Sequence, residues 1–144
     1  MATTKKKCHR CERGLSPKRQ RKKYCYPCER EVKKEQQKAA HDAYVQRVYG
    51  LLPGEYDKIY EAQGGKCFIC QRATGRTRKL AVDHDHAIGD GKREAVRGLL
   101  CKPCNRMLGH GRDDPKMFSR AAAYLKNPPA RSVLYEGSEG PRAA

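Results

Sequence analysis

Residues 67–109 read CFICQRATGRTRKLAVDHDHAIGDGKREAVRGLLCKPCNRMLG, and this stretch decides the fold. It begins with the pair Cys67 and Cys70 and nearly ends with the pair Cys101 and Cys104, each spaced Cys-x-x-Cys. Four thiols in two close pairs suit one tetrahedral Zn²⁺, which prefers sulfur and nitrogen ligands and fills all four positions at a structural site. We therefore expect one zinc ion to clamp both ends of this stretch.

The segment between the two pairs predicts a small ββα unit. Its elements are a strand at 80–82, a hairpin turn at Gly89-Asp90-Gly91, a return strand at 95–100 and a helix from 101 to about 108. The first strand leads into Asp83-His84-Asp85-His86, and Asn105 directly follows the last cysteine. A zinc ion at the base of this unit would bring His84 close to Asn105.

The composition predicts a small hydrophobic core that needs cross-links, such as bound metal ions or disulfides, for stability. The chain has 144 residues, no Trp, two Phe and 33% charged residues, and its eight cysteines form four Cys-x-x-Cys pairs. The N-terminal segment MATTKKKCHR lacks the apolar stretch of a signal peptide, and no apolar run is long enough to span a bilayer. Paired cysteines in a non-secreted chain favour metal over disulfides, although an extracellular source would leave the disulfide alternative open.

The charge distribution predicts a polyanion as partner, most simply nucleic acid. The formal charge is +16, and residues 1–50 carry 15 basic and 5 acidic side chains, which is +10 of that total. A solvated basic surface and a basic partner of acidic proteins are the alternatives. A polybasic membrane-surface protein is a third, but no helix has the apolar face that it requires.

The N-terminal part predicts a second zinc site followed by a helix. Four cysteines have the spacing of a zinc ribbon or knuckle: Cys8, Cys11, Cys25 and Cys28. His9 could replace one thiol, although four cysteines make this unnecessary. Residues 29–49 lack Gly and Pro and predict a long basic helix with a thin stripe of Val32, Ala39, Ala43 and Val48. We interpret it as a connector; the alternative is the surface of a homodimer.

Two shorter helices complete the predicted architecture. Pro53 opens one that Gly64-Gly65 ends, and Asp113 or Asp114 caps another that Asn127-Pro128-Pro129 ends. The second has an apolar face that we expect to pack in the core: Met117, Phe118, Ala121, Ala122 and Leu125. The tail from Ala130 to Ala144 should fray. The predicted domains are a zinc ribbon at 1–28, a helical connector at 29–65, a zinc-bound ββα domain at 66–127 and a tail at 128–144.

The residues of the predicted site suit phosphodiester hydrolysis. A neutral imidazole such as His84 accepts a proton from water at physiological pH. Asp83 offers a hard anionic oxygen and Asn105 a carbonyl oxygen, which are ligands that Mg²⁺ prefers. His86 and Arg97 are placed to contact the phosphate or the leaving group.

Other histidines and motifs have simpler interpretations. The Asp83–His86 run could be an exposed polar turn or supply further zinc ligands, but the cysteine quartet already saturates a zinc site. His41 is expected on a helix face, and no role is assigned to His110. Gly89-Asp90-Gly91-Lys92 lacks the upstream Gly and the following Ser or Thr of a P-loop, which argues against ATP binding.

Residues 67–109 resemble the recombination endonuclease VII family of phages and bacteria, a branch of the His-Me finger (HNH-like) nucleases. The Asp-His-Asp-His run and the segment VRGLLCKPCN are the most specific parts, and the resemblance extends over roughly residues 8–109. It implies zinc on Cys67, Cys70, Cys101 and Cys104. It also implies Mg²⁺ or Mn²⁺ on Asp83 and Asn105, with His84 as general base and His86 assisting at the phosphate.

The chain departs from this family at several positions. The family's phage junction-resolving member carries a glutamate where Leu108 stands and a histidine where Ala81 stands. Its long C-terminal region, part of which helps form its dimer, has no counterpart here beyond Lys126. These differences concern branched-DNA selectivity and obligate dimerisation, and they leave the metal–histidine core intact.

The sequence therefore predicts a small α+β metalloenzyme with a zinc ribbon, a long basic helix and a zinc-stabilised ββα-metal nuclease domain. We expect a divalent-metal-dependent DNA endonuclease of the cytoplasm of a bacterium or phage-infected host. Its substrate would be duplex DNA or branched DNA such as a Holliday junction. The alternative is a non-catalytic zinc protein that only binds nucleic acid; it shares the charge and the cysteines but has no use for Asp83, His84 and Asn105.

Overall fold

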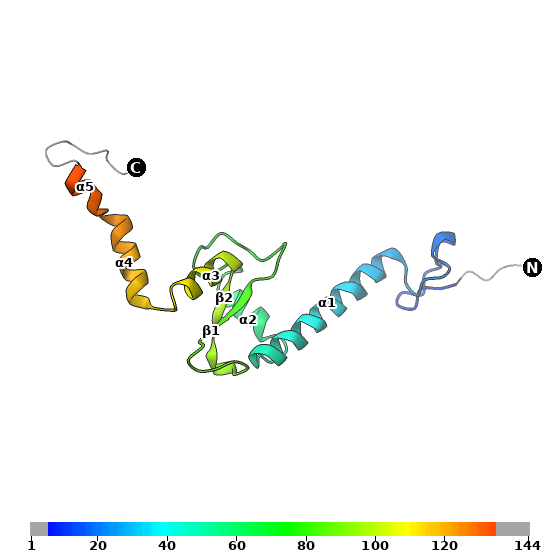
Figure 1. The fold of residues 1–144 in the computed structure, drawn as a ribbon. Helices are drawn as coiled ribbons and strands as arrows, with labels where there is room; N and C mark the ends of the chain where they lie inside the picture. Colours follow the sequence, from blue (N-terminus) through cyan, green and yellow to red (C-terminus); the bar gives the residue numbers. More distant parts are fainter. Residues whose placement is uncertain (1–5, 135–144) are drawn as a thin grey trace, which may run out of the picture. The chain divides into compact units, whose positions relative to one another are not determined.

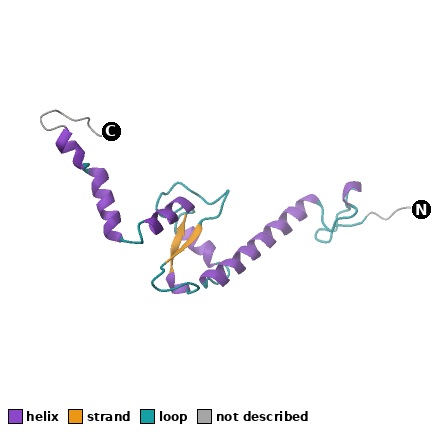
Figure 2. Cartoon of the chain, in the orientation of Figure 1, coloured by secondary structure: helices purple, strands orange, loops and turns teal. Residues whose placement is uncertain are grey.

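A computed structural model describes residues 6–134 and shows a mainly helical chain with one two-stranded sheet (Figures 1 and 2). The chain divides into two compact units. Residues 1–65 and 82–98 form unit 1, and residues 66–81 and 99–144 form unit 2. Each unit is described by itself below. Among the described residues, no helix combines the length and apolar character needed to cross a bilayer.

Unit 1 begins with the first cysteine quartet. An isolated bridge between Lys7 and Gly14 and a 3-10 turn, η1 (Pro17–Arg19), shape the segment before the first long helix. Buried Cys8, Leu15 and Cys28 form its core, with Tyr24 and Cys25 packed against them. Within the described residues, the regular structure of this predicted ribbon is one bridge and one turn. Cysteines make up much of its core.

Helix α1 (Tyr26–Tyr49) begins three residues before the predicted start and includes the last cysteine of the quartet. Pro27 fits the first turn of a helix because its missing N–H has no intrahelical partner there. Gly50 ends α1 in the left-handed conformation at φ +70°. Of the predicted thin stripe, Val32 and Val48 are half-buried and Ala39 and Ala43 are exposed, and the buried residues of α1 are Cys28 and Val45.

Helix α2 (Glu55–Ala62) begins after Gly54 rather than at Pro53. Glu55 stabilises this start because its carboxylate accepts a hydrogen bond from the Leu52 N–H at 2.9 Å. Tyr56 is buried, and its ring meets the His41 ring edge-on at 4.5 Å. The sequence prediction that His41 lies on a helix face is consistent with this contact, which joins α1 to α2.

The two strands of the hairpin lie close to the predicted positions, 80–82 and 95–100. Strand β1 (Ala81–His84) pairs with β2 (Val96–Leu100), and the 3-10 turn η2 (Arg93–Ala95) precedes β2. A hydrogen bond of 2.8 Å from the Asp85 N–H to the Ala95 carbonyl closes the pairing. In the loop between the strands, Gly89 and Gly91 adopt φ of +103° and +74°, as the turn signal predicts.

Unit 2 contains the second cysteine quartet and the C-terminal helices. Helix α3 (Lys102–His110) follows β2, and α4 (Pro115–Lys126) is capped by Asp114, whose carboxylate accepts from the Lys116 N–H at 2.9 Å. The predicted cap is therefore confirmed. A further helix, α5 (Pro129–Leu134), lies where a fraying tail was expected, and the rest of that tail, 135–144, is outside the described residues.

The prediction that α4 packs in the core was wrong. Met117 and Leu125 are 42% and 76% exposed, and α4 has no buried residue. Only Phe118 is half-buried, with its ring so close to Gly111 that a Cβ there would lie 2.3 Å from it. The apolar spacing correctly predicted a helix, but it does not specify which surface that helix contacts.

Candidate metal and nuclease site

The second cysteine quartet has the geometry of a zinc site. The four Sγ atoms of Cys67, Cys70, Cys101 and Cys104 lie within 4.8 Å of one another, and none is in a disulfide. The Cys70 and Cys101 sulfurs are 3.8 Å apart. Tetrahedral ligands at a Zn–S distance of about 2.3 Å would be separated by about 3.8 Å. The four sulfurs therefore fit one zinc ion.

Backbone donors around this quartet favour thiolates. The N–H groups of Ala73 and Arg72 are the main cause that lowers the pKa of Cys70 to about 6. Burial and the neighbouring thiols instead raise the pKa of Cys104 to about 12. In such a cluster some thiols lose their protons more readily than others. A divalent cation stabilises the thiolates by taking the place of the protons.

The first quartet has the same character. Its sulfurs also lie within 4.8 Å of one another, with those of Cys11 and Cys25 3.7 Å apart. The Cys25 N–H donates to the Cys8 sulfur at 3.3 Å. Burial tends to raise the pKa of Cys8, but backbone donors together outweigh it and bring the pKa to about 6. Both quartets can thus bind zinc, and His9 is not needed as a ligand.

Asp83 lies in β1 and is 7% exposed, between buried Val82 and half-buried His84. Its carboxylate accepts two hydrogen bonds from Arg97 on β2, from Nε to Oδ2 at 2.8 Å and from Nη2 to Oδ1 at 3.0 Å. A buried carboxylate needs a positive partner or donors. The guanidinium of Arg97 is that positive partner, and the role of Asp83 in metal binding stays a prediction.

His84 ends β1 and is held by the loop that follows. Its Nε2 lies 2.8 Å from the Asp90 Oδ1, and its ring centroid is 4.6 Å from that of His86 and 5.5 Å from that of Tyr49. The carboxylate can only accept, so Nε2 carries a hydrogen and Nδ1 is the nitrogen that accepts a proton in the neutral ring. The structure thus brings together His84, His86 and Asp90, while Asp83 precedes His84 in β1 and its carboxylate pairs with Arg97.

Asn105 lies in the first turns of α3, one residue after Cys104. Its N–H donates to the Cys101 carbonyl at 2.9 Å, and its side chain is half-buried. The helix position agrees with the prediction. Asn105 belongs to unit 2 and Asp83 to unit 1, and their joint binding of one cation remains a prediction.

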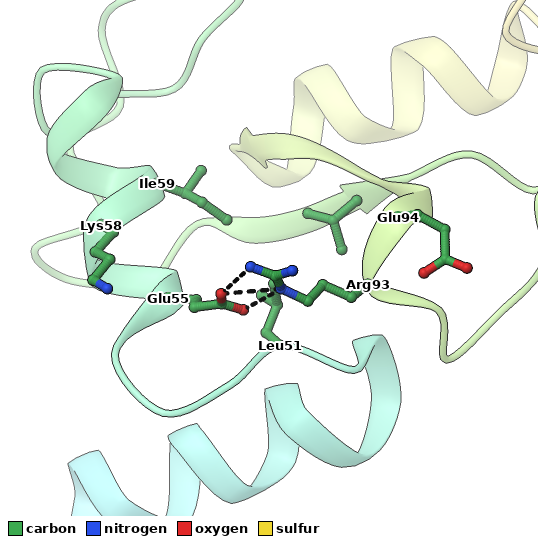
Figure 3. A pocket seen from close by; sticks show the side chains of 7 residues that line it. Leu51, Glu55, Lys58, Ile59, Arg93 and Glu94 are labelled. Carbon is green, nitrogen blue, oxygen red and sulfur yellow. Dashed lines mark hydrogen bonds and ion pairs between the residues drawn. The ribbon is translucent and has the colours of Figure 1, made fainter.

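A second arginine–carboxylate pair lies beside the hairpin, where α2 faces η2. Figure 3 shows the Glu55 carboxylate directed at the Arg93 guanidinium, in a pocket of about 390 Å³ that Leu51, Ile59 and Val96 also line. Arg93 Nε lies 2.8 and 3.0 Å from the two carboxylate oxygens. Arg93, with the Leu52 N–H, lowers the pKa of Glu55 to about 2. This pair joins α2 to the loop that carries Asp90.

The N-terminal part of unit 1 presents a strongly basic surface. Its glutamates are largely occupied internally: Glu29 pairs with Arg19, and Glu31 and Glu35 pair with Arg10. Within the described part of the chain, no ion pair involves ten exposed cations: Lys6, Lys7, Arg13, Lys18, Arg21, Lys22, Lys23, Arg30, Lys33 and Lys34. The positive charge predicted from composition is therefore available to a partner.

Arg30 and Lys33 line a groove of about 650 Å³ together with Tyr24 and Val32. Tyr24 is held by two contacts, since its ring meets the His9 ring at 6.2 Å and its carbonyl accepts from Arg19 Nε at 3.1 Å. Basic side chains beside an aromatic ring are typical of nucleic-acid surfaces.

The class of protein is a small fold of helices and one hairpin with two cysteine quartets that could each bind a zinc ion. The sequence model of recombination endonuclease VII matches residues 42–127, which include β1, β2 and α3. The chain belongs to the recombination endonuclease VII family. The resemblance inferred from residues 67–109 is therefore confirmed.

Two curated phage proteins are similar to this chain. It is 52% identical over 90 residues to the Gene 59 protein of Mycobacterium phage L5, which is 62% of this chain and 52% of that protein. It is 51% identical over the same length to the Gene 59 protein of Mycobacterium phage D29, with the same coverage. The chain thus spans about half the length of these relatives. No solved structure matches it.

The structure adds partners that sequence reasoning missed. Asp90 was interpreted only as part of a turn, and Tyr49 only as the end of a helix, yet both lie beside His84. For Arg97, contact with the phosphate or the leaving group stays a prediction, and the partner that the sequence reasoning missed is Asp83. A signal for the last pair exists in the sequence, because residues 83 and 97 lie on paired strands and carry opposite charges.

Proposed function

We propose that this chain is a divalent-metal-dependent DNA endonuclease that hydrolyses phosphodiester bonds. The observation that carries the proposal is the end of β1, where the buried residue Asp83 is followed by His84, whose imidazole is hydrogen-bonded to Asp90. Membership of the recombination endonuclease VII family gives this cluster a reaction class. The exposed basic surface of unit 1 supports DNA as the partner.

In the proposed mechanism, His84 is the general base. Asp90 orients the ring by accepting from Nε2, and Nδ1 takes the proton of the attacking water. His86, whose ring lies 4.6 Å from that of His84, assists at the phosphate. Asp83 and Asn105 would hold Mg²⁺ or Mn²⁺, which supplies a Lewis acid for the phosphate and the leaving oxygen.

The cleavage test uses zinc-loaded protein and supercoiled plasmid with Mg²⁺, Mn²⁺ or EDTA. We expect nicking with either cation, none with EDTA, and a loss of about 10²-fold or more in His84→Ala, the range that a general base contributes. His110→Ala is the matched control, since this exposed histidine lies at the end of α3. Normal nicking by His84→Ala would refute the assignment of the base. DNA retention without cleavage under every cation would favour the non-catalytic binding protein.

Selectivity for branched DNA is the finer part of the proposal. It is tested by the rates on linear duplex, single strand, flap and four-way junction at equal concentration. Faster cleavage of the junction supports a junction-resolving activity, and equal rates on duplex and junction support a general nicking nuclease. Sedimentation of the DNA-bound protein tests whether the substrate is held by one chain or by a homodimer.

A further inference from the structure

Arg97 occupies the carboxylate to which the proposed function assigns the cation. The two side chains form a fork, in which separate guanidinium nitrogens reach separate oxygens of Asp83 at 2.8 and 3.0 Å. The Asp83 side chain is 9% exposed and that of Arg97 33%. Bidentate pairs of this kind are among the strongest hydrogen-bonded contacts in proteins, and burial limits the screening of this one by water.

The pair changes the charge that a divalent cation meets. Asp83 supplies the formal negative charge of the proposed ligand set, since Asn105 is neutral, and the guanidinium already balances that charge. A divalent ion that joins the same carboxylate is repelled by the guanidinium at close range. The carboxylate of Asp90, which contacts His84, belongs to a side chain that is 85% exposed and therefore strongly solvated.

We infer that Arg97 couples the binding of the catalytic cation to the binding of DNA. Without DNA, the guanidinium holds Asp83 and competes with the cation. A phosphate of the substrate offers the guanidinium two oxygens that can accept in the same bidentate way, and it adds negative charge to the site. Arg97 then leaves the carboxylate, and the cation binds. This inference rests on the proposed function, because it takes Asp83 to be a cation ligand.

The coupling is reciprocal. If DNA raises the affinity for the cation by some factor, the cation raises the affinity for DNA by the same factor. If the fork is formed in nine molecules out of ten, it weakens the apparent cation affinity of the DNA-free protein about tenfold. Substituting Arg97 should remove this weakening.

The test measures Mn²⁺ binding to the zinc-loaded full chain by electron paramagnetic resonance, without DNA. We expect Arg97→Gln to bind Mn²⁺ about tenfold more tightly than the unsubstituted chain. Arg93→Gln is the matched control, since Arg93 forms a similar fork with Glu55; it should leave the affinity unchanged. An Arg97→Gln affinity that is unchanged or weaker overturns the inference, because Arg97 would then support the ligand rather than compete.

A second measurement avoids dependence on the folding of Arg97→Gln. In the His84→Ala background, which prevents cleavage, added duplex DNA should tighten Mn²⁺ binding about tenfold or more. By reciprocity, saturating Mn²⁺ should increase the DNA affinity by the same factor. An Mn²⁺ affinity that DNA does not alter overturns the inference.

Asp83→Asn separates the failure of this inference from the failure of the proposed function. If Asp83→Asn leaves Mn²⁺ binding unchanged with and without DNA, no cation binds at Asp83, and the proposed site fails together with the coupling. If Asp83→Asn weakens Mn²⁺ binding while Arg97→Gln does not strengthen it, the site stands and only the coupling by Arg97 is refuted.

Discussion

Gly50 lies at the end of α1 where the backbone of the β1–β2 loop approaches it closely. Its φ of +70° is in the left-handed region, and its N–H caps α1 through the Gln46 carbonyl at 2.9 Å. A Cβ at this position would lie 2.7 Å from the Gly91 carbonyl oxygen and 3.0 Å from the Arg93 N–H nitrogen. Both obstacles are backbone atoms, which cannot rotate away as a side chain can.

The substitution Gly50→Ala should therefore destabilise unit 1 by two separate effects. The left-handed conformation costs a non-glycine residue about 1–2 kcal/mol. Overpacking against the fixed loop backbone adds about 1–3 kcal/mol. Gly54→Ala is the matched control, because Gly54 has a similar φ of +82° but open space around it, so only the first effect applies.

The assay is urea unfolding of the zinc-loaded protein, followed by circular dichroism at 222 nm because the chain has no Trp. We expect Gly50→Ala to lower the free energy of unfolding by about 1–3 kcal/mol more than Gly54→Ala. Since the displaced loop carries Asp90, which orients His84, plasmid nicking should fall in Gly50→Ala alone. Equal losses of stability in the two variants, within about 0.5 kcal/mol, would refute the close approach.

Three further predictions address the basic surface, the pH dependence and the metal. Replacing Arg30 and Lys33 together by Glu should weaken DNA binding and reduce the slope of log K against log salt by about 2, measured by fluorescence anisotropy; an unchanged slope would exclude this groove from the contact. The pKa of Glu55 is lowered to about 2, so its contribution to stability is present above the unfolded-state pKa near 4.3 and is lost as pH falls through the folded-state value. Between about pH 4 and pH 2, the free energy of unfolding should consequently fall less in Glu55→Gln than in the unsubstituted chain. Identical acid profiles would contradict the pairing. Finally, Cys70→Ser should release about one zinc equivalent and melt α3 in circular dichroism, whereas full zinc retention would contradict the four-sulfur site.

Much of the fold could be predicted because local signals and metal-ligand spacing pointed to the same elements. Asp114 caps α4 as expected, and the strand-turn-strand reading around Gly89 and Gly91 corresponds to β1 and β2. The position of Asn105 on a helix followed from its place after Cys104. These features depend on a few neighbouring residues, and such local preferences are legible in a single sequence.

The errors concern surfaces rather than elements. An amphipathic pattern predicts that a helix has an apolar face but not what that face contacts, and Leu125 of α4 is 76% exposed as a result. The start of α1 at Tyr26 was missed because the cysteine spacing suggested a boundary at Cys28, although Pro27 is a helix-start signal.

The partners of the site residues were the hardest to predict. Asp90 reaches His84 across a loop whose path depends on two glycines with positive φ, and the pairing of Arg97 with Asp83 depends on strand register. Residue type identified Asp83, His84 and Asn105 as candidates, but type alone does not show which charges neutralise one another in the absence of substrate.

The central claim is that one cation is held jointly by Asp83 and Asn105. It is tested most directly by a double-mutant cycle of Mn²⁺ affinity in the presence of uncleaved DNA, with Asp83→Asn, Asn105→Ala and the double variant. If both residues bind the same ion, each single substitution weakens the Mn²⁺ affinity. The fold-loss of the double variant is then smaller than the product of the two single fold-losses. An affinity that Asn105→Ala leaves unchanged, or losses that multiply independently, would contradict the shared site.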